Sequence, residues 1–305
     1  MAEVYRARSS GAAGFEKIVA IKRVLPHIAS DQEFTSMFVE EARICANLTH
    51  ANIAQVFEFG RIDGAYFIAM EYVHGKDLRE IQEQFKGKHV PLPFAIHVVT
   101  HVCSALEYAH SRQDSAGNRL KIVHCDVSPH NVLISFEGAV KLIDFGIARA
   151  TTLAKPRDAS NLEGKYAYMS PEQVAGEQLD ARSDVFSAGT ILYECITGRR
   201  LFDGPNEPAI IEAVRRAEVP PPSSINRGVP RKLDEIVLKA LARDRDERFQ
   251  RAEDLQSELE RFAQASRLMF SSKQLSRWMK TTFASELSHG AGASSGAGVS
   301  MGQAI

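Results

Sequence analysis

Residues 124–131 read His-Cys-Asp-Val-Ser-Pro-His-Asn, and residues 144–146 read Asp-Phe-Gly. Short strand-like runs adjoin both stretches, at 121–124, 131–135 and 139–144. Asn131 follows Asp126 closely enough for one loop to place both side chains at the same site. Asp144 ends a strand-like run and adds a second carboxylate. Oxygen donors of this kind are the ligands that Mg²⁺ prefers, so the two stretches offer candidate ligands for this cation.

A third stretch, Val19-Ala-Ile-Lys22, lies on a predicted strand over 18–24. A lysine on a rigid strand offers a fixed cation for phosphate groups. The predicted helix over 33–47 carries two adjacent candidates, Glu40 and Glu41, to hold its ammonium group in place. Without the other two stretches, a surface lysine and an ordinary helix glutamate would be the better interpretation.

Composition narrows the class of protein without indicating its chemistry. The chain has 305 residues, 44% of them apolar and 25% charged, and its formal net charge is −1. This balance gives no reason to expect nucleic acid or an anionic membrane as a partner. No apolar run approaches the about 18 residues of a membrane span, and the N-terminus is unlike a signal peptide. The four cysteines show no metal-ligand spacing, so we expect a reduced, cytoplasmic protein.

The first part of the chain alternates strand signals with one helix. Strand-like runs are predicted at 4–8, 18–24, 54–62 and 65–73. Asp31 is placed to cap the helix over 33–47. Asp63-Gly64 separates the last two strands and predicts a hairpin.

The second part of the chain is mainly helical. Helices are predicted from about residue 94 and over 182–198, 231–265 and 273–287. We expect 150–165 to be an exposed loop and the proline-rich segment 218–230 to be a stiff connector. The last of the predicted helices is amphipathic, with Trp278 and Phe283 on its apolar face. It either docks on the larger lobe, which we favour, or recruits a partner.

The order and context of the three stretches resemble the protein-kinase family, specifically the eukaryotic-like Ser/Thr kinases of bacteria. The resemblance extends from residue 1 to about residue 265. It implies an α+β bilobal fold, with a small antiparallel sheet and one helix above a mainly helical larger lobe. The implied division is an N-lobe over 1–73, a C-lobe over 74–265, a helical extension over 266–288 and a disordered Gly/Ala/Ser tail over 289–305.

The resemblance also implies the roles of the polar residues. Lys22 contacts the α- and β-phosphates of ATP, and Glu41 is its expected partner. Asp126 accepts or orients the proton of the attacking hydroxyl, while Asn131 and Asp144 bind Mg²⁺. His124 is expected to be a structural hydrogen-bonding residue beneath the loop.

Adenine recognition is implied at the junction of the lobes. Met70 takes the gatekeeper position, and Glu71 and Val73 take the hinge positions. The residues expected to sandwich the base are Val4, Ala20 and Leu133. Each of these apolar side chains could equally belong to the core.

Other residues match the family pattern but take no part in phosphoryl transfer. Ser170-Pro-Glu172 closes the activation segment, with Arg248 as the expected buried partner of Glu172. Asp184 is expected to cap the helix that it begins and to hold the backbone of the catalytic loop. These matches distinguish a protein kinase from the small-molecule phosphotransferases that share the upper lobe.

The chain departs from the family pattern at its start. Ala2-Glu3-Val4 matches only the tail of the glycine-rich phosphate-covering loop. We therefore expect Met1 to be an internal methionine of a protein that begins further upstream.

Two further departures lie in the catalytic loop. Cys125 replaces the arginine that pairs with a phosphorylated activation loop, and we interpret it as a small buried side chain rather than a redox switch. Ser128 replaces the catalytic-loop lysine, while Lys165 replaces a threonine of the activation segment. We interpret this pair as a reciprocal exchange that makes Lys165 a catalytic cation, the alternative being two independent losses. Candidate phosphorylation sites remain at Thr151, Thr152 and Ser160.

The predicted function is ATP- and Mg²⁺-dependent transfer of a phosphoryl group to Ser or Thr hydroxyls of proteins, the kinase itself among them. A pseudokinase that serves as a nucleotide-binding or scaffold module is the alternative. The retained Lys22, Asp126, Asn131 and Asp144 argue against the pseudokinase, whereas Ser128 and the shortened phosphate-covering loop argue for it.

Overall fold

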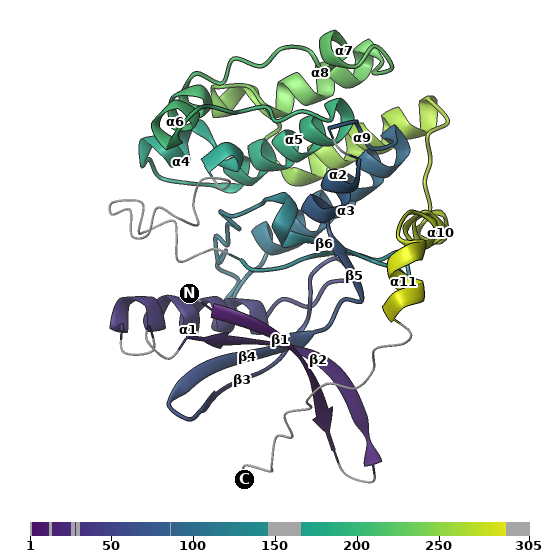
Figure 1. Ribbon diagram of the computed structural model, residues 1–305. Coiled ribbons are helices and arrows are strands. Elements are labelled where there is room, and N and C mark those ends of the chain that lie inside the picture. The colour runs from purple at the N-terminus through teal and green to yellow at the C-terminus, as the bar shows by residue number, and fades with distance from the viewer. Residues whose placement is uncertain are drawn as a thin grey trace.

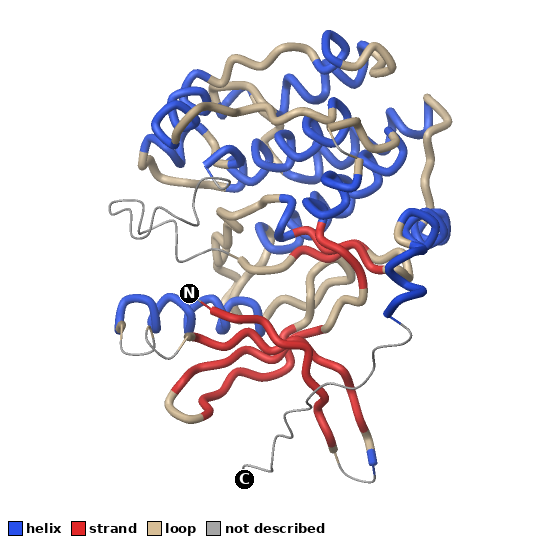
Figure 2. Tube along the Cα trace, in the orientation of Figure 1, coloured by secondary structure: helices blue, strands red, loops and turns tan. Residues whose placement is uncertain are grey.

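The chain forms two lobes, one built on a β-sheet and the other on helices (Figure 1). The computed structural model describes residues 2–11, 14–25, 28, 31–85, 87–145 and 166–290, with the side chains of 33, 289 and 290 left aside. The tube view separates the strands of the small lobe from the helices of the large one (Figure 2). This is the α+β bilobal fold that the sequence predicts. The expected domain boundaries remain a prediction.

The small lobe contains a four-stranded antiparallel sheet in the order β1-β2-β4-β3. Its strands are β1 (Ala2–Ser10), β2 (Glu16–Val24), β3 (Val56–Ile62) and β4 (Ala65–Glu71). Asp63 and Gly64 join β3 to β4 with φ values of 50° and 80°. Two consecutive positive φ angles are typical of the tight turn that Asp-Gly favours, so the predicted hairpin is confirmed.

Helix α1 (Gln32–Ala46) packs on this sheet. The Asp31 carboxylate accepts a hydrogen bond from the Phe34 N–H at 3.2 Å, which satisfies one free amide of the first turn. The apolar face of α1 and the facing side of the sheet form a small core. Its buried members are Val24, Phe38, Ala42 and Ile68.

A second, three-stranded antiparallel sheet begins the large lobe. Its strands are β5 (Gly75–Asp77), β6 (Val132–Ser135) and β7 (Val140–Leu142). The short helix η2 (Pro129–Asn131) leads directly into β6, and β7 ends just before Asp144. The sheet therefore fixes the ends of both loops that carry the predicted chemistry.

Helices make up the rest of the large lobe. Their bounds are α2 (Leu78–Gln84), α3 (Leu92–His110), α4 (Pro171–Ala175), α5 (Ala181–Thr197), α6 (Glu207–Arg216), α7 (Pro222–Ile225), α8 (Arg231–Ala240), α9 (Ala252–Ala265), α10 (Ser272–Thr282) and α11 (Ala284–Gly290), with the 3-10 helices η5 (Tyr166–Tyr168) and η6 (Arg245–Glu247). Among the described residues, no helix is both long and apolar enough to cross a membrane.

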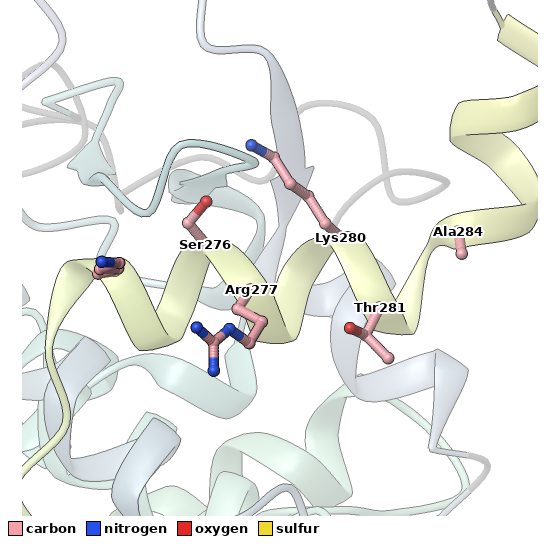
Figure 3. A pocket seen from close by; sticks show the side chains of 6 residues that line it. Ser276, Arg277, Lys280, Thr281 and Ala284 are labelled. Atoms are coloured by element: carbon pink, nitrogen blue, oxygen red, sulfur yellow. The ribbon is translucent and has the colours of Figure 1, made fainter.

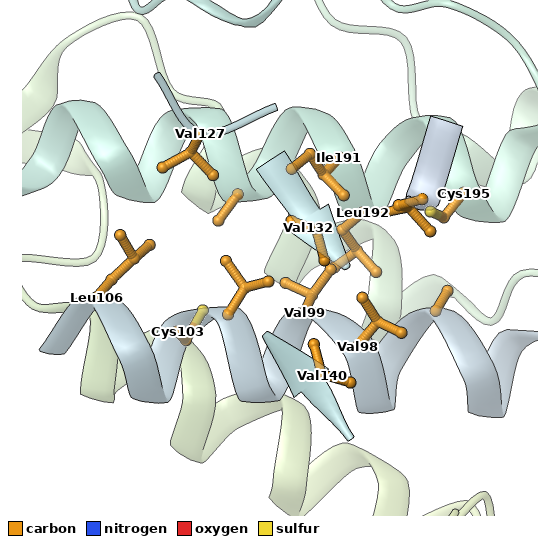
Figure 4. Close-up of a cluster of buried hydrophobic side chains, with 14 of the residues drawn as sticks. Val98, Val99, Cys103, Leu106, Val127, Val132, Val140, Ile191, Leu192 and Cys195 are labelled. Atoms are coloured by element: carbon orange, nitrogen blue, oxygen red, sulfur yellow. The ribbon is translucent and has the colours of Figure 1, made fainter. Parts of the chain in front are cut away.

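The main core lies between α3, α5 and the β6–β7 strands (Figure 4). Apolar side chains recur along α3 at helical spacing and are fully buried, among them Val98, Val99 and Leu106. Ile191 and Leu192 of α5 meet them, also without exposure. Because a continuous buried surface joins these elements, the β6–β7 sheet rests on a rigid base.

Three predictions about the helices are wrong in detail. The run over 231–265 is not one helix, because it breaks into α8, η6 and α9. The run over 273–287 divides at Phe283 into α10 and α11. The proline-rich segment 218–230 is not only a connector, since α7 lies within it.

Helices α10 and α11 dock on the large lobe, as we favoured. Leu275 and Met279 are fully buried, and Phe283 is 3% exposed. Trp278 lies against the rings of Phe85 and Phe94, with centroids 5.8 and 4.4 Å away. The apolar face of the helix is therefore occupied within the chain itself.

The β6–β7 turn also holds α10 in place. The Ser276 hydroxyl donates to the Phe136 carbonyl at 2.7 Å. Gly138 adopts φ 90°, and a Cβ there would lie 2.0 Å from the Ser272 carbonyl oxygen. On its outer side, α10 lines a shallow hollow with Arg277, Lys280 and Thr281 (Figure 3).

Candidate active site

Lys22 connects three elements of the fold. Its ammonium group lies 2.7 Å from Glu41 Oε1 on α1 and 2.9 Å from Asp144 Oδ1 after β7. Burial alone would lower the pKa of Lys22, but the carboxylates of Asp144 and Glu41 outweigh it and raise the pKa above its usual value. Lys22 is therefore a fixed, fully charged cation at the junction of the two lobes.

Glu41, rather than Glu40, is the partner of Lys22. Glu40 is exposed and lies 3.6 Å from Arg43 on the same helix. Burial raises the pKa of the Glu41 carboxyl, and the charge of Lys22 acts against this rise. The choice between two adjacent glutamates thus follows from which side chain points toward the sheet.

The catalytic loop brings Asp126 and Asn131 together. The Asn131 amide nitrogen donates to the Asp126 carbonyl at 2.7 Å, and Asn131 is 8% exposed. This bond uses an N–H of the amide and leaves its carbonyl oxygen as an acceptor. The main-chain carbonyl of Asn131 also accepts a hydrogen bond from the Ile143 N–H at 3.0 Å. This bond ties the loop to the segment that leads to Asp144.

His124 is a buried structural residue. Its Nδ1 accepts from the Asp126 N–H at 3.2 Å, and its Nε2 lies 3.0 Å from the Ile143 carbonyl. The ring packs 4.5 Å from that of Phe145. Burial lowers the pKa of His124, so the imidazole is neutral and can both donate and accept. These contacts agree with the structural role that we expected.

Asp184 holds the catalytic loop from below, as expected. Its carboxylate accepts from the His124 and Cys125 N–H groups at 2.8 and 2.9 Å. The expectation that Asp184 caps its own helix is wrong. Asp180 caps α5 by accepting from the Arg182 N–H, and Asp184 lies within the first turn.

Two residues that the sequence did not single out complete this support. His110 Nε2 lies 2.7 Å from Asp184 Oδ2, and Gln173 Nε2 donates to the Cys125 carbonyl at 2.9 Å. Both are tertiary contacts between distant segments, and neither belongs to a sequence pattern that would have marked it.

Cys125 is a small buried side chain, 7% exposed, with φ 62°. Burial raises the pKa of its thiol far above the ordinary value, and the nearby Asp184 and Asp126 carboxylates add to the rise. Because the thiolate is the reactive form of cysteine, this environment disfavours a redox role.

The residues expected around adenine line one side of the β-sheet and the start of the second sheet. Val4 pairs directly with Lys22, and Ala20 lies two residues before Lys22, so all three share one face. Val4 is 65% exposed, and Leu133 on β6 is partly exposed. Their exposure leaves this face open to a ligand.

The expected hinge residues follow β4. The Glu71 carboxylate lies 2.8 Å from Lys141 Nζ and 3.2 Å from the Gln55 N–H. The Glu71 N–H also donates to the Gln55 carbonyl at 2.8 Å, so both the side chain and the amide of Glu71 are engaged within the protein. Val73 is partly exposed, just before β5.

Arg248 and Glu172 form the expected buried ion pair. Two guanidinium nitrogens lie 2.8 and 2.9 Å from the two carboxylate oxygens, and both residues are at least 95% buried. Burial would raise the pKa of Glu172, but the bonds and charge of Arg248 lower it below its usual value. A bidentate pair of this kind fixes the position of the segment around Glu172.

Several predicted residues lie outside the described part of the chain. They are Gly146, Thr151, Thr152, Ser160 and Lys165. The exchange partner Ser128 is described, and its side chain is buried with no hydrogen-bond partner for its hydroxyl among the described residues.

Comparisons with known proteins agree with this geometry. The family model for the protein kinase domain matches residues 1–260. The chain belongs to the protein kinase family. Members of this family generally use ATP together with a divalent metal ion.

The kinase resembles bacterial members of the family. It is 39% identical over 264 residues to the Tyrosine-protein kinase MasK of Myxococcus xanthus, covering 86% of this chain and 41% of that protein. It is 35% identical over 253 residues to the Serine/threonine-protein kinase PrkC of Bacillus subtilis, covering 83% and 38%. The chain thus spans about two fifths of the length of these relatives.

A solved structure shares the fold. The kinase domain of Mycobacterium tuberculosis PknI (C20A mutant) superposes with a TM-score of 0.64 at 28% identity, covering 86% of this chain and 91% of that one. Helices α10 and α11 lie beyond the residues that the family model matches.

The donor atoms of the site fit a hard divalent cation. Asp144 supplies a carboxylate and Asn131 an amide oxygen, and Mg²⁺ typically takes one or two protein oxygens together with substrate phosphates. Within the described part of the chain, no group of three or more His, Cys, Asp or Glu side chains could hold a metal by itself. A metal held jointly with a nucleotide therefore suits this site better than a resident metal centre.

Proposed function

We propose that this kinase transfers the γ-phosphoryl group of Mg²⁺-ATP to Ser and Thr hydroxyls of proteins. The observation that carries the proposal is the position of Lys22. Its ammonium group bridges Glu41 and Asp144, while Asn131 is bonded to Asp126 in the adjoining loop. Phosphoryl transfer depends chiefly on alignment and charge neutralisation, and this arrangement provides both.

Each polar residue then has a separate role. Lys22 neutralises and positions the α- and β-phosphates, and Glu41 keeps its ammonium group in place. The Asp144 carboxylate and the side-chain amide oxygen of Asn131 hold Mg²⁺. Asp126 accepts or orients the proton of the attacking hydroxyl. The metal, when bound, neutralises charge on the phosphates.

Nucleotide recognition is proposed for the face of the sheet beside Lys22. Val4, Ala20 and Leu133 contact the two faces of adenine, and the Glu71 carbonyl and main-chain groups of Val73 meet its polar edge. The exposure of Val4 and the shared face of Ala20 and Lys22 support this assignment.

The accepting hydroxyl is tested directly, because one relative is named a tyrosine kinase and another a serine/threonine kinase. The purified chain is incubated with γ-labelled ATP and a mixed protein substrate, with Mg²⁺ or with a chelator. Acid hydrolysis then separates the phosphoamino acids. We expect metal-dependent label on phosphoserine and phosphothreonine. Label confined to phosphotyrosine would overturn the choice of acceptor, and bound nucleotide without transfer would establish a pseudokinase.

Lys165 is proposed as a catalytic cation that compensates for Ser128. The buried hydroxyl of Ser128 supplies no charge beside Asp126, which leaves a cation to be provided by another segment. A double-mutant cycle with Ser128→Lys and Lys165→Thr tests the exchange, because residues in contact couple and distant ones do not. We expect the double variant to be more active than the two single effects predict. Additive effects on kcat/KM would contradict the exchange.

The kinase is further proposed to work in the cytoplasm. All four cysteines are buried and free, as suits a reducing compartment.

A further inference from the structure

A cavity of about 200 Å³ lies between α2 and the end of α5, away from Lys22 and Asp144. The segment that follows α2 and the turn that follows α5 complete its walls. Its charged lining residues are Arg79, Glu83, Lys88, Glu194, Arg199 and Arg200. None of these residues belongs to the phosphoryl-transfer site described above.

The cavity has an excess of positive charge in a chain whose formal net charge is −1. Four of the lining side chains are basic, and two are acidic. Both acids are already engaged within the protein. Glu83 lies 2.8 Å from Arg79, and Glu194 accepts from the Tyr168 hydroxyl at 2.6 Å and from the Leu201 N–H at 3.2 Å.

Three cations of the cavity form no ion pair with a described acidic side chain, namely Lys88, Arg199 and Arg200. The charge of Arg200 still acts on the Glu194 carboxyl in the same wall, which leaves Lys88 and Arg199 as the least compensated of the three. Like charges gathered around a concavity attract an anion of complementary shape. The cavity therefore favours a carboxylate or a similar anionic group.

The fold places these cations together through a close backbone contact. Gly198 ends α5 with φ 69°, and a Cβ there would lie 2.4 Å from the Lys88 carbonyl carbon and 2.5 Å from the His89 nitrogen. Only glycine permits this approach without displacing the facing segment. The contact brings Lys88 beside the Arg199-Arg200 pair.

The cavity also holds an unused acceptor. Gln82 Nε2 donates to the Cys195 sulfur at 3.5 Å, while Gln82 Oε1 is buried and has no partner among the described residues. A buried carbonyl oxygen without a donor costs free energy. A ligand that brings an N–H group together with its anionic group would satisfy it, and a peptide does so.

Helix α2 connects the cavity to the catalytic loop. Helix α2 has seven residues and is thus about 10 Å long. Its cap, Asp77, lies 3.5 Å from His130 of the catalytic loop, and its other end forms the cavity wall. An extended peptide covers this length with about three residues.

A second contact comes from the residues just before Ser170-Pro-Glu172. The Tyr168 hydroxyl donates to Glu194 in the cavity wall. The end of the activation segment is thus bonded directly to the cavity.

We propose that this cavity binds acidic side chains of the protein substrate, about three or more residues from the accepting hydroxyl. The proposal rests on the proposed kinase function, and it names the class of substrate as proteins with an acidic run close to the phosphorylated Ser or Thr.

The test compares three synthetic peptides with a single central serine. One is neutral, and the others carry three glutamates at positions three to five before or after the serine. Binding is measured by fluorescence anisotropy with labelled peptides, and transfer is measured as kcat/KM with Mg²⁺-ATP. We expect one acidic peptide to exceed the neutral peptide by about fivefold in both, as two partly exposed ion pairs would give.

Charge reversal at Arg199→Glu with Arg200→Glu tests the site. The control is Arg215→Glu with Arg216→Glu, an exposed arginine pair on α6 that contacts Glu212 and does not line the cavity. We expect the acidic-to-neutral ratio to fall to 1 or below only in the first variant. Lys88→Glu, at an exposed position, repeats the test if the double variant fails to fold. Raised salt should also reduce the ratio.

The two readouts separate the two proposals. An acidic preference in binding without any transfer would support the cavity and contradict the kinase function. Equal binding and equal transfer for all peptides would overturn the cavity and leave the kinase function standing. A preference for the acidic peptide that persists both in the Arg199→Glu, Arg200→Glu variant and in Lys88→Glu would also overturn the proposed role of the cavity.

Discussion

At the scale of single residues, the site depends on one cation held between two carboxylates. Lys22 has side-chain oxygens of Glu41 and Asp144 within 2.9 Å, and its side chain is 13% exposed. Removing it would leave two buried or partly buried carboxylates facing each other without compensation. The charge of Lys22 thus serves the fold of the cleft as well as the proposed chemistry.

Lys22→Met tests this position. We expect the phosphoryl-transfer rate to fall by roughly 100-fold or more, because a positioned charge at the phosphates is lost. The measurement is label transfer from ATP, with melting temperature recorded alongside. Lys17→Met, an exposed lysine on the same strand, is the matched control. Equal activity of the two variants would contradict the role of Lys22.

The sequence predicted the residues of the site better than their supports. Lys22, Asp126, Asn131 and Asp144 lie in short stretches whose spacing indicates their use. His110 and Gln173 could not be predicted, because each acts through one tertiary contact from a distant helix. Asp184 was placed correctly against the catalytic loop, but the capping role belongs to Asp180, which occupies the extended position before the first turn.

At the scale of elements, α10 and α11 support the sheet that carries the site. The Phe283 ring lies 6.3 Å from that of Phe136 on the β6–β7 turn, and Glu286 lies 2.7 Å from Lys76 on β5. Strand β6 directly follows Asn131. The extension therefore braces the strands next to the catalytic loop.

Phe283→Ala is expected to lower the free energy of unfolding by about 3–5 kcal/mol, the cost of removing a buried phenylalanine. Denaturant unfolding of the whole chain measures it. Phe15→Ala, at a side chain that is 65% exposed, is the matched control and should stay within about 0.5 kcal/mol of the parent. Similar losses for both variants would show that α10 and α11 do not brace the lobe.

His97 makes the packing of α3 sensitive to pH. Burial lowers the pKa of His97 to about 4, and the neighbouring His101 adds to the effect. Because this pKa lies below the unfolded value of about 6.5, the unfolded chain binds the proton more readily. The contribution of His97 to stability is therefore complete above pH 6.5 and is lost as pH falls toward 4.

Denaturant midpoints of the parent and of His97→Gln, measured from pH 7.5 to 4.5, test this dependence. We expect the parent to lose more stability than the variant over that range. Parallel pH profiles would contradict a neutral, buried His97.

One predicted helix is interrupted by a tertiary contact. We predicted helix over 231–265, yet the chain leaves the helix after α8 and Arg248 turns inward to Glu172. Its guanidinium also donates to the Ala242 and Arg243 carbonyls at 2.7 and 2.9 Å, which have no place in a continuous helix. A buried ion pair formed across 76 residues overrides the local helical pattern.

At the scale of the whole molecule, the two lobes are joined at the strand that leads to Asp144. The Ala54 N–H donates to the Leu142 carbonyl at 3.1 Å, and the Leu142 N–H donates to the Asn52 carbonyl at 2.8 Å. Lys141 adds an ion pair to Glu71 beside the hinge. These bonds, together with the ion pair to Lys22, hold Asp144 against the small lobe.

The bilobal fold could be predicted because the order of strands, helix and motifs is local information. The basic cavity could not, because its residues come from α2, the segment that follows it and the end of α5. Its charge excess arises only when Gly198 lets these segments meet. No single stretch of sequence contains that arrangement.

The most direct test of the account is label transfer from γ-labelled Mg²⁺-ATP by Asp126→Asn. Asp63→Asn is the matched control, because Asn-Gly suits the same hairpin turn as Asp-Gly. We predict that Asp126→Asn still binds nucleotide but transfers label at least about 100-fold more slowly, while Asp63→Asn matches the parent. Undiminished transfer by Asp126→Asn would contradict the proposed site.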